Sequence, residues 1–146
     1  MFYGEQTYNL DDKGRMLIPK EYREELGEVV VLMRGVDGQI NVYPKPFFDQ
    51  IRQRVAQFGE NESFRLTRRT INAAMDCEVD RQGRILIPSQ LREYAGLSDH
   101  VLVNGNGDHI EIWHRDEYEQ SFGRLKDQFK KKPEDFAKIS EAGVPL

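Results

Sequence analysis

The sequence has little that would support disulfide, metal or membrane chemistry. Cys77 is the only cysteine, which excludes an internal disulfide and a cysteine metal cluster, and we expect a small buried residue there. The histidines lack the spacing of metal ligands; they are His100, His109 and His114. No apolar run is long enough to span a bilayer, and the first residues lack a signal-peptide pattern. We therefore expect no metal, no cofactor and a cytoplasmic protein.

The sequence also lacks a recognisable catalytic constellation. Gly105-Asn106-Gly107 misses the third glycine of a dinucleotide-binding fingerprint and falls in an expected turn between strands. No serine lies in a nucleophile elbow. The adjacent acids Asp11 and Asp12 fit turn capping better than acid–base catalysis. The sequence therefore predicts that the chain is not an enzyme.

A surplus of positive charge is absent as well. The chain has 21 basic and 25 acidic residues, for a net charge of −4. This balance argues against a protein that coats DNA indiscriminately, but it is compatible with cations gathered on one face. A DNA site would then depend on a few placed side chains, and linking weak sites by oligomerisation can raise avidity about a hundredfold.

What the sequence does contain is an internal repeat. Leu10–Gly27 (LDDKGRMLIPKEYREELG) aligns without a gap with Val79–Gly96 (VDRQGRILIPSQLREYAG). The shared pattern is D-x-x-G-R-x-x-I-P-x-x-x-R. Agreement across so many residue types is hard to obtain by chance, and a repeat constrains the architecture of the whole chain.

Each copy predicts strand, tight turn, strand and short helix. An aspartate begins the turn, a glycine supplies a positive φ, a proline opens the helix and a second glycine ends it. These residues are Asp11, Gly14, Pro19 and Gly27 in the first copy, and Asp80, Gly83, Pro88 and Gly96 in the second.

The arginine after each turn glycine has two possible roles. Arg15 and Arg84 could pair locally with Asp11 and Asp80 and so clamp the turns, or they could point toward an anionic partner. For one copy alone the clamp is favoured. The duplication makes contact with an anionic partner a stronger alternative. The clamp is still favoured, because a duplicated fold also copies its structural pairs.

The rest of the chain divides around the two copies. We expect a first repeat with its helix over residues 1–59, a connecting basic helix in 60–76, a second repeat with its helix over 77–132, and a tail over 133–146. The expected strands after the motifs are Val29–Met33, Gln39–Tyr43, Val101–Val103 and His109–Trp113, and the expected longer helices are Phe47–Gln57, Ser63–Asp76 and Asp116–Lys132. One short helix is expected after Pro133.

The helix expected over Ser63–Asp76 is the most basic local segment. Its arginines are Arg65, Arg68 and Arg69. They could contact a DNA backbone or another subunit, or form an ordinary solvated face, and the solvated face is slightly favoured.

The double D-x-x-x-R pattern, the start Met1-Phe2-Tyr3-Gly4 and the I-P-x-x-x-R continuation closely resemble the MraZ family. These are bacterial DNA-binding regulators related to the AbrB and MazE group, and the resemblance extends to about Tyr118. It implies an α+β fold: a swapped-hairpin (double-split) β-barrel of two tandem repeats with peripheral α-helices. It also implies a ring-shaped homo-oligomer.

By position, the resemblance implies that the two turns bind DNA. The implied contacts are Asp11, Lys13, Gly14 and Arg15, with Asp80, Arg81, Gly83 and Arg84. Arg23 and Arg92 are candidates for phosphate contacts. One departure is that Gln82 stands where the first copy has Lys13, although Arg81 beside it supplies a cation.

The resemblance implies a sequence-specific transcriptional regulator, nucleoid-associated, that represses the division and cell-wall gene cluster by binding direct repeats in promoter DNA. The alternative is an antitoxin-like protein-interaction module with weak DNA binding. A disordered tail that wraps a partner would favour the alternative. The tail of this chain instead has a helical, amphipathic pattern, which favours packing or self-assembly.

Overall fold

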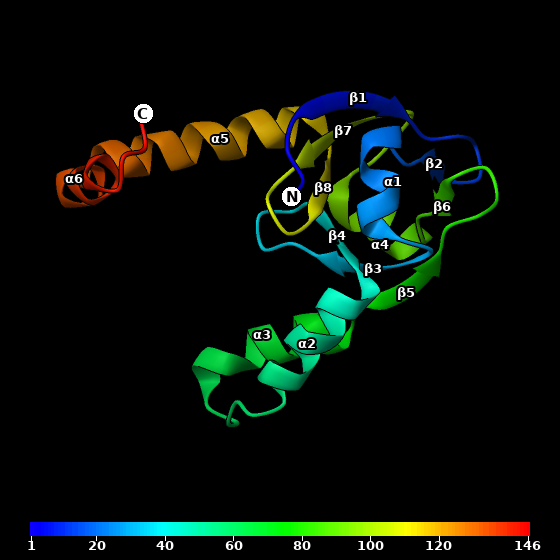
Figure 1. Cartoon of the computed structure of the whole chain (residues 1–146), viewed down its shortest axis with the longest axis horizontal. Coiled ribbons are helices and arrows are strands. Elements are labelled where there is room, and N and C mark those ends of the chain that lie inside the picture. Colours follow the sequence, from blue (N-terminus) through cyan, green and yellow to red (C-terminus); the bar gives the residue numbers. More distant parts are fainter. The chain divides into compact units, whose positions relative to one another are not determined.

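The computed structural model describes residues 1–146 except the side chain of Ser63. The chain forms two compact units, Met1–Arg115 and Asp116–Leu146, which are described separately (Figure 1). The first unit holds the strands and short helices of both repeats, and the long helix of the second repeat falls in the second unit.

The first unit is built on antiparallel β-structure. Its strands are β1 (Glu5–Asn9), β2 (Arg15–Leu17), β3 (Val29–Arg34), β4 (Ile40–Pro44), β5 (Met75–Glu78), β6 (Arg84–Leu86), β7 (His100–Gly105) and β8 (Ile110–Trp113). Six of them form one sheet in the order β1-β7-β8-β4-β3-β5, and β2 and β6 form a separate two-stranded ribbon.

Strand pairing runs between the repeats. β1 of the first repeat pairs with β7 of the second, β5 of the second pairs with β3 of the first, and β4 pairs with β8. The ribbon joins one strand from each repeat, with Met16 opposite Ile85. The two repeats are therefore intertwined and share one set of hydrogen bonds.

The expected strand, tight turn and strand are present in each copy, but the two strands do not pair with each other as a hairpin. A single bridge, Leu10 to Met16, joins the two sides of the first turn, because β1 continues into the six-stranded sheet while β2 leaves to pair with β6. The α+β class is confirmed. Among the described residues the strands form these two hydrogen-bonded groups rather than one closed barrel.

Four helices complete the first unit: α1 (Lys20–Leu26), α2 (Lys45–Val55), α3 (Glu62–Asn72) and α4 (Ser89–Ala95). Pro19 and Pro88 precede α1 and α4, which Gly27 and Gly96 end with φ of 79° and 64°. α2 and α3 lie side by side (Figure 1). Asn61 caps α3 by accepting a hydrogen bond from the Phe64 N–H at 3.1 Å, as expected for an N-cap asparagine.

The helix expected over Ser63–Asp76 is wrong at its C-terminal end. α3 stops at Asn72, and Met75 and Asp76 belong to β5, where they pair with Leu32 and Val31 of β3. Met75, a good helix former, takes the extended form here because the edge of β3 offers backbone partners.

The main core lies where the sheet, the ribbon and helices α1 and α4 meet. Met16 is 0% exposed and Ile85 is 1% exposed. They share this core with Ile18, Leu26, Ile87 and Leu91. Cys77, expected to be buried, is partly buried against the same core. A second apolar cluster packs α2 and α3 onto the other side of β3 and contains Val31, Met33, Phe48, Val55 and Ile71.

A buried polar cluster lies on β8. Glu111 is 7% exposed and accepts hydrogen bonds from Trp113 Nε1 at 2.9 Å and Asn106 Nδ2 at 3.0 Å. Its Oε2 lies 3.0 Å from His109 Nε2, and His109 Nδ1 lies 2.7 Å from Asp108. Burial raises the pKa of Glu111, but its donors outweigh burial and hold that pKa at about 2. Burial lowers the pKa of His109, but its two carboxylate partners outweigh it and raise that pKa.

The second unit begins at Asp116 and holds all but the first residue of α5 (Arg115–Lys130), followed by α6 (Pro133–Glu141). The long helix expected near Asp116–Lys132 and the short helix after Pro133 are confirmed. A mostly apolar groove in this unit is lined by Phe122, Leu125, Phe129, Pro133, Phe136 and Leu146, together with Lys126 and Lys130. Within the described residues, no helix is both long enough and apolar enough to cross a membrane.

We predict that Ile85→Ala lowers the free energy of unfolding by about 2–5 kcal/mol, because it leaves a cavity at the centre of the shared core. Leu86→Ala is the matched control: its side chain is 53% exposed, and the change should stay within about 0.5 kcal/mol. Urea denaturation of both variants measures this. If Ile85→Ala lowers the free energy of unfolding no more than Leu86→Ala does, the inner face of the ribbon does not contribute to the core.

We predict that the His109 contact makes stability fall as pH rises. A raised folded-state pKa means that the stabilisation is full below the unfolded value of about 6.5 and is lost as pH rises through the folded value. His109→Gln should lower stability by about 1–3 kcal/mol at pH 6, with a smaller difference at pH 9. His100→Gln is the control, since it removes an exposed ring whose Nδ1 lies 2.7 Å from Asn9 Oδ1 and which makes no hydrogen bond to Asp108 or Glu111 within the described residues. A pH-independent difference would contradict the prediction.

Candidate nucleic-acid interface

The first turn is held by one aspartate. Asp11 Oδ1 accepts hydrogen bonds from the backbone N–H of Lys13 at 3.0 Å and of Arg15 at 2.8 Å. Its Oδ2 accepts a hydrogen bond from Arg15 Nε at 2.6 Å. The Gly14 N–H closes the turn on the Asp11 carbonyl at 3.0 Å. One carboxylate therefore fixes both the backbone of the turn and the direction of the arginine.

The second turn repeats this arrangement. Asp80 Oδ1 accepts hydrogen bonds from the N–H of Gln82 and of Arg84, both at 2.9 Å, and Asp80 Oδ2 accepts one from Arg84 Nε at 2.9 Å. Both arginines therefore form the local clamp that the sequence favoured. Hydrogen bonds from the Arg15 backbone and side chain hold the pKa of Asp11 at about 2, and the Arg84 N–H lowers the pKa of Asp80 in the same way. Both aspartates are ionised at neutral pH.

The clamp uses only one of the three nitrogens of each guanidinium. Nε of Arg15 and Nε of Arg84 face the aspartates, and no bond from their terminal nitrogens occurs among the described residues. Each arginine side chain is 31% exposed. The two roles considered for these arginines are therefore compatible, since the clamp orients a side chain whose outer nitrogens can still donate.

The ribbon places the two arginines on one face. Arg15 is opposite Leu86, and Leu17 is opposite Arg84. Because side chains alternate along a strand, these four project outward while Met16 and Ile85 project into the core. The outer face thus carries two arginines on a diagonal, roughly 7–8 Å apart for such neighbours.

Each turn is braced by an arginine of the other repeat. Arg92 Nε donates a hydrogen bond to the Ile87 carbonyl at 3.0 Å, and its guanidinium lies against Gly14. Arg23 makes the same bond to Ile18 and lies against Gly83. Backbone bonds add to this lock, because the Ile18 N–H donates to the Gly83 carbonyl at 2.8 Å. The structure gives Arg23 and Arg92 a bracing role, and phosphate contact by them stays a prediction.

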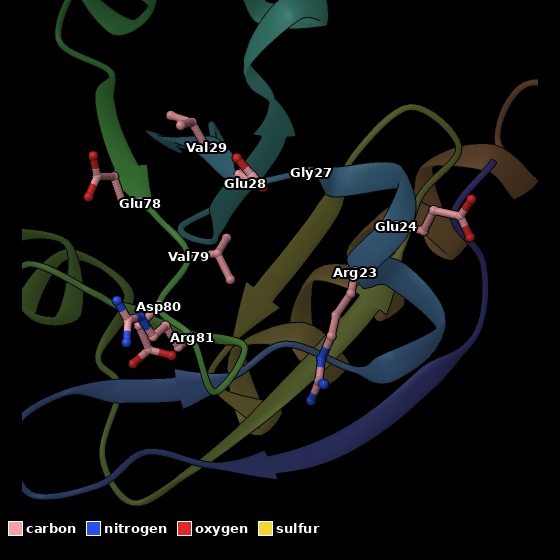
Figure 2. A pocket seen from close by; sticks show the side chains of 9 residues that line it. All are labelled: Arg23, Glu24, Gly27, Glu28, Val29, Glu78, Val79, Asp80 and Arg81. Atoms are coloured by element: carbon pink, nitrogen blue, oxygen red, sulfur yellow. The ribbon is translucent and has the colours of Figure 1, made fainter.

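A cavity of about 640 Å³ lies beside the second turn. Figure 2 shows Arg23 reaching down from α1 while Asp80 and Arg81 come from the turn of the other repeat. The lining also includes Glu24, Gly27, Glu28, Val29, Glu78 and Val79. Carboxylates outnumber guanidinium groups in this lining, so the cavity has the wrong charge balance for a phosphate.

The tips of the turns are exposed and differ between the copies. Asp12 and Lys13 form the first tip, and Arg81 and Gln82 form the second. All four side chains are exposed, whereas Gly14 and Gly83 are buried. The candidate contacts predicted from sequence are therefore gathered at two similar turns that present different side chains.

One of the three arginines of the basic helix α3 is held by contacts with neighbouring residues. Arg68 donates a hydrogen bond to the Phe58 carbonyl at 2.6 Å and pairs with Glu60 at 3.4 Å. Arg65 and Arg69 are exposed on α3. This helix remains a second basic surface outside the ribbon.

Two features of the interface were not singled out from the sequence. The bracing by Arg23 and Arg92 crosses between repeats, and the only sequence signal was the shared final arginine of the motif. The outward position of Leu17 and Leu86 was missed because their segments read as apolar throughout. Strict alternation from Arg15 would have placed Leu17 on the arginine face. Among the described residues no group of three or more His, Cys, Asp or Glu side chains is arranged to hold a metal.

These features define a class: a tandem-repeat α+β protein whose intertwined halves present two aspartate-braced arginine turns on one β-ribbon. The family model described as "MraZ protein, putative antitoxin-like" matches residues 1–72 and again residues 70–139. The chain belongs to the MraZ family.

Individual relatives agree with this assignment. The chain is 41% identical over 124 residues to the transcriptional regulator MraZ of Leuconostoc citreum, covering 84% of this chain and 86% of the relative. It is 40% identical over 131 residues to the protein of the same name from Moorella thermoacetica, covering 88% and 92%. The Desulforamulus reducens protein, also named transcriptional regulator MraZ, is 33% identical over 141 residues, covering 95% and 99%.

We predict that Gly14→Ala destabilises the first unit by about 1–3 kcal/mol, because Gly14 has φ +84° and a non-glycine residue is strained there. An added Cβ would also lie 2.6 Å from Arg92 Cζ, so Arg92 would have to move. Gly59→Ala is the control, since nothing lies within 4 Å of the Cβ it would add. Thermal unfolding of both variants tests this, and equal midpoints would contradict a constrained turn.

Proposed function

We propose that the chain is a sequence-specific DNA-binding transcriptional regulator that reads double-stranded promoter DNA through the outer face of the β2–β6 ribbon. The single observation that carries this proposal is the repeated Asp–Arg clamp, which aims two partly exposed guanidinium groups outward from one rigid ribbon. A two-stranded ribbon fits the major groove, and arginine donating to O6 and N7 of guanine is the commonest specific contact there.

Each side chain has a role in this proposal. Arg15 and Arg84 donate to guanine edges, and Asp11 and Asp80 orient them. Lys13 and Arg81, exposed at the tips, bind phosphates. Gly14 and Gly83 let the turns form, and Arg23 and Arg92 hold the turns in place, with phosphate contact as a further role.

The proposal includes a swapped-hairpin (double-split) β-barrel and a ring-shaped homo-oligomer. The exchange of strands between the repeats and the Leu10–Met16 bridge between β1 and β2 support the barrel. The acidic net charge supports the ring, because a chain with so few placed cations gains affinity when several copies contact spaced DNA repeats together.

The proposal extends to the target, which the resemblance to the family suggests. We propose repression of the division and cell-wall gene cluster through direct repeats in its promoter, by a cytoplasmic protein associated with the nucleoid. The names of the relatives, transcriptional regulator MraZ, support regulation of transcription.

An antitoxin-like protein-interaction module is the second candidate. The apolar groove of the second unit favours it, because Phe122 and Leu125 are 58% and 56% exposed there. Exposed apolar surface of this kind marks a contact with another protein. A protein-interaction module does not account for the duplicated arginine clamps, so DNA binding remains the primary proposal.

We predict that Arg15→Ala with Arg84→Ala abolishes the preference for the promoter fragment upstream of the protein's own gene over a scrambled fragment. Each lost guanine contact should cost about 1–3 kcal/mol. Mobility shifts over a salt series measure affinity and salt slope for both fragments. The variant should retain weak, salt-sensitive binding to both, since the phosphate contacts remain.

Arg65→Ala with Arg69→Ala is the matched control, because it removes two exposed arginines from α3. It should keep the sequence preference. If it loses binding while the ribbon variant does not, α3 is the DNA surface. If the wild type prefers neither fragment, the protein-interaction candidate replaces the primary one.

A further inference from the structure

Two exposed leucines lie beside the arginines of the ribbon. Leu17 is 42% exposed and Leu86 is 53% exposed, while Met16 and Ile85 between the arginine and leucine of each strand are buried. Leu17 is opposite Arg84 and Leu86 is opposite Arg15. The outer face of the ribbon therefore consists of two cross-strand Arg–Leu pairs, related by the repeat.

The fold itself does not require leucine at these positions. The core needs the inward residues of each strand, and Ile18 and Ile87, which follow the leucines, are 0% exposed. A polar residue in place of Leu17 or Leu86 would leave that core intact and would be better solvated. Both copies nevertheless place an apolar side chain on the rigid face that holds the guanidinium groups.

We propose that Leu17 and Leu86 contact the 5-methyl groups of thymines that neighbour the guanines read by Arg84 and Arg15. This rests on the proposed function. The thymine methyl is the apolar feature of the major groove, and apolar side chains recognise it by contact. A ribbon that enters this groove with arginine and leucine side by side matches a guanine and a thymine side by side.

The spacing supports this pairing. Directly opposed residues of an antiparallel pair have Cβ atoms roughly 4.5–5.5 Å apart. Successive bases on one strand rise by about 3.4 Å. When an arginine sits on a guanine, the opposed leucine thus lies over an adjacent base rather than over the same one. Each Arg–Leu pair reads a step of two bases, and the ribbon reads two such steps.

The test begins with a selection of duplexes from a random pool by the full-length wild-type protein. The enriched duplex is then made with deoxyuridine in place of each thymine in turn, which removes only the methyl group. Substitution beside a critical guanine should weaken wild-type binding about fourfold, the equivalent of roughly 0.8 kcal/mol for one buried methyl-sized group. Thymines away from those guanines should show no change.

The DNA substitutions are combined with a protein variant, Leu17→Ala with Leu86→Ala, in a double-mutant cycle. This variant should bind the thymine and deoxyuridine duplexes equally, because the partner of the methyl is gone, while it still requires the guanines. Leu66→Ala is the matched control, since Leu66 is a 66% exposed leucine on α3. It should discriminate between the duplexes as the wild type does. The difference between the effect of deoxyuridine on the wild type and its effect on the leucine variant measures the leucine–methyl contact alone.

Distinct outcomes separate this inference from the proposed function. If no duplex is enriched, both fail. If a duplex is enriched and requires Arg15 and Arg84 but wild-type binding ignores every thymine methyl, only the leucine inference fails. Sedimentation of the leucine variant tests whether these leucines form a subunit contact. If the variant no longer assembles and wild-type binding is unchanged by deoxyuridine, the leucines serve self-association and the inference is overturned.

Discussion

The exchange of strands between the repeats is the constraint on which the rest of this structure depends. Each strand of the first repeat pairs with a strand of the second, so neither repeat can complete its hydrogen bonds or its core alone. Met16 and Ile85 meet at the centre of the ribbon and are buried by both halves. Removing strand pairing from one copy would expose the apolar face of the other, so the two copies fold as one cooperative unit.

The same exchange makes the arginine turns rigid. Arg23 lies against Gly83 and Arg92 against Gly14, so each turn is braced from the opposite repeat. Asp11 then fixes Arg15 within its own turn. Holding a long side chain in place before it meets a partner removes an ordering cost of about 0.5–1.5 kcal/mol per side chain. The two turns carry only a few cations, and in the proposed DNA complex preorganisation of this kind would let each one contribute more to binding.

Much of this organisation could be predicted from sequence because it is local. The turn aspartates, the turn glycines and the helices after each proline are fixed by neighbours a few residues away. Strand partners are not local. The sequence on either side of the Asp11–Arg15 turn is compatible with a simple hairpin and equally with two strands that diverge into separate sheets. The end of α3 was misplaced for the same reason, since only the edge of β3 makes Met75 and Asp76 extended. Exposure of Leu17 likewise depends on which face of the ribbon the core covers.

The two repeats have kept their backbone and diverged where divergence is least constrained. At the turns, Asp12 and Lys13 face solvent in one copy, and Arg81 and Gln82 in the other, on the same hydrogen-bonded frame. At the centre of the sheet, Asn41 is directly opposite Glu111 and both are buried, but the hydrogen bonds from Asn106 and Trp113 go to Glu111. A scaffold with near-twofold pairing thus carries two unlike tips. If both tips engage one DNA segment, the segment is read with a direction, because reversing it would bring Gln82 to the position of Lys13. In the proposed DNA complex, chemical asymmetry on a symmetric frame would thus make each chain read its DNA segment in one orientation.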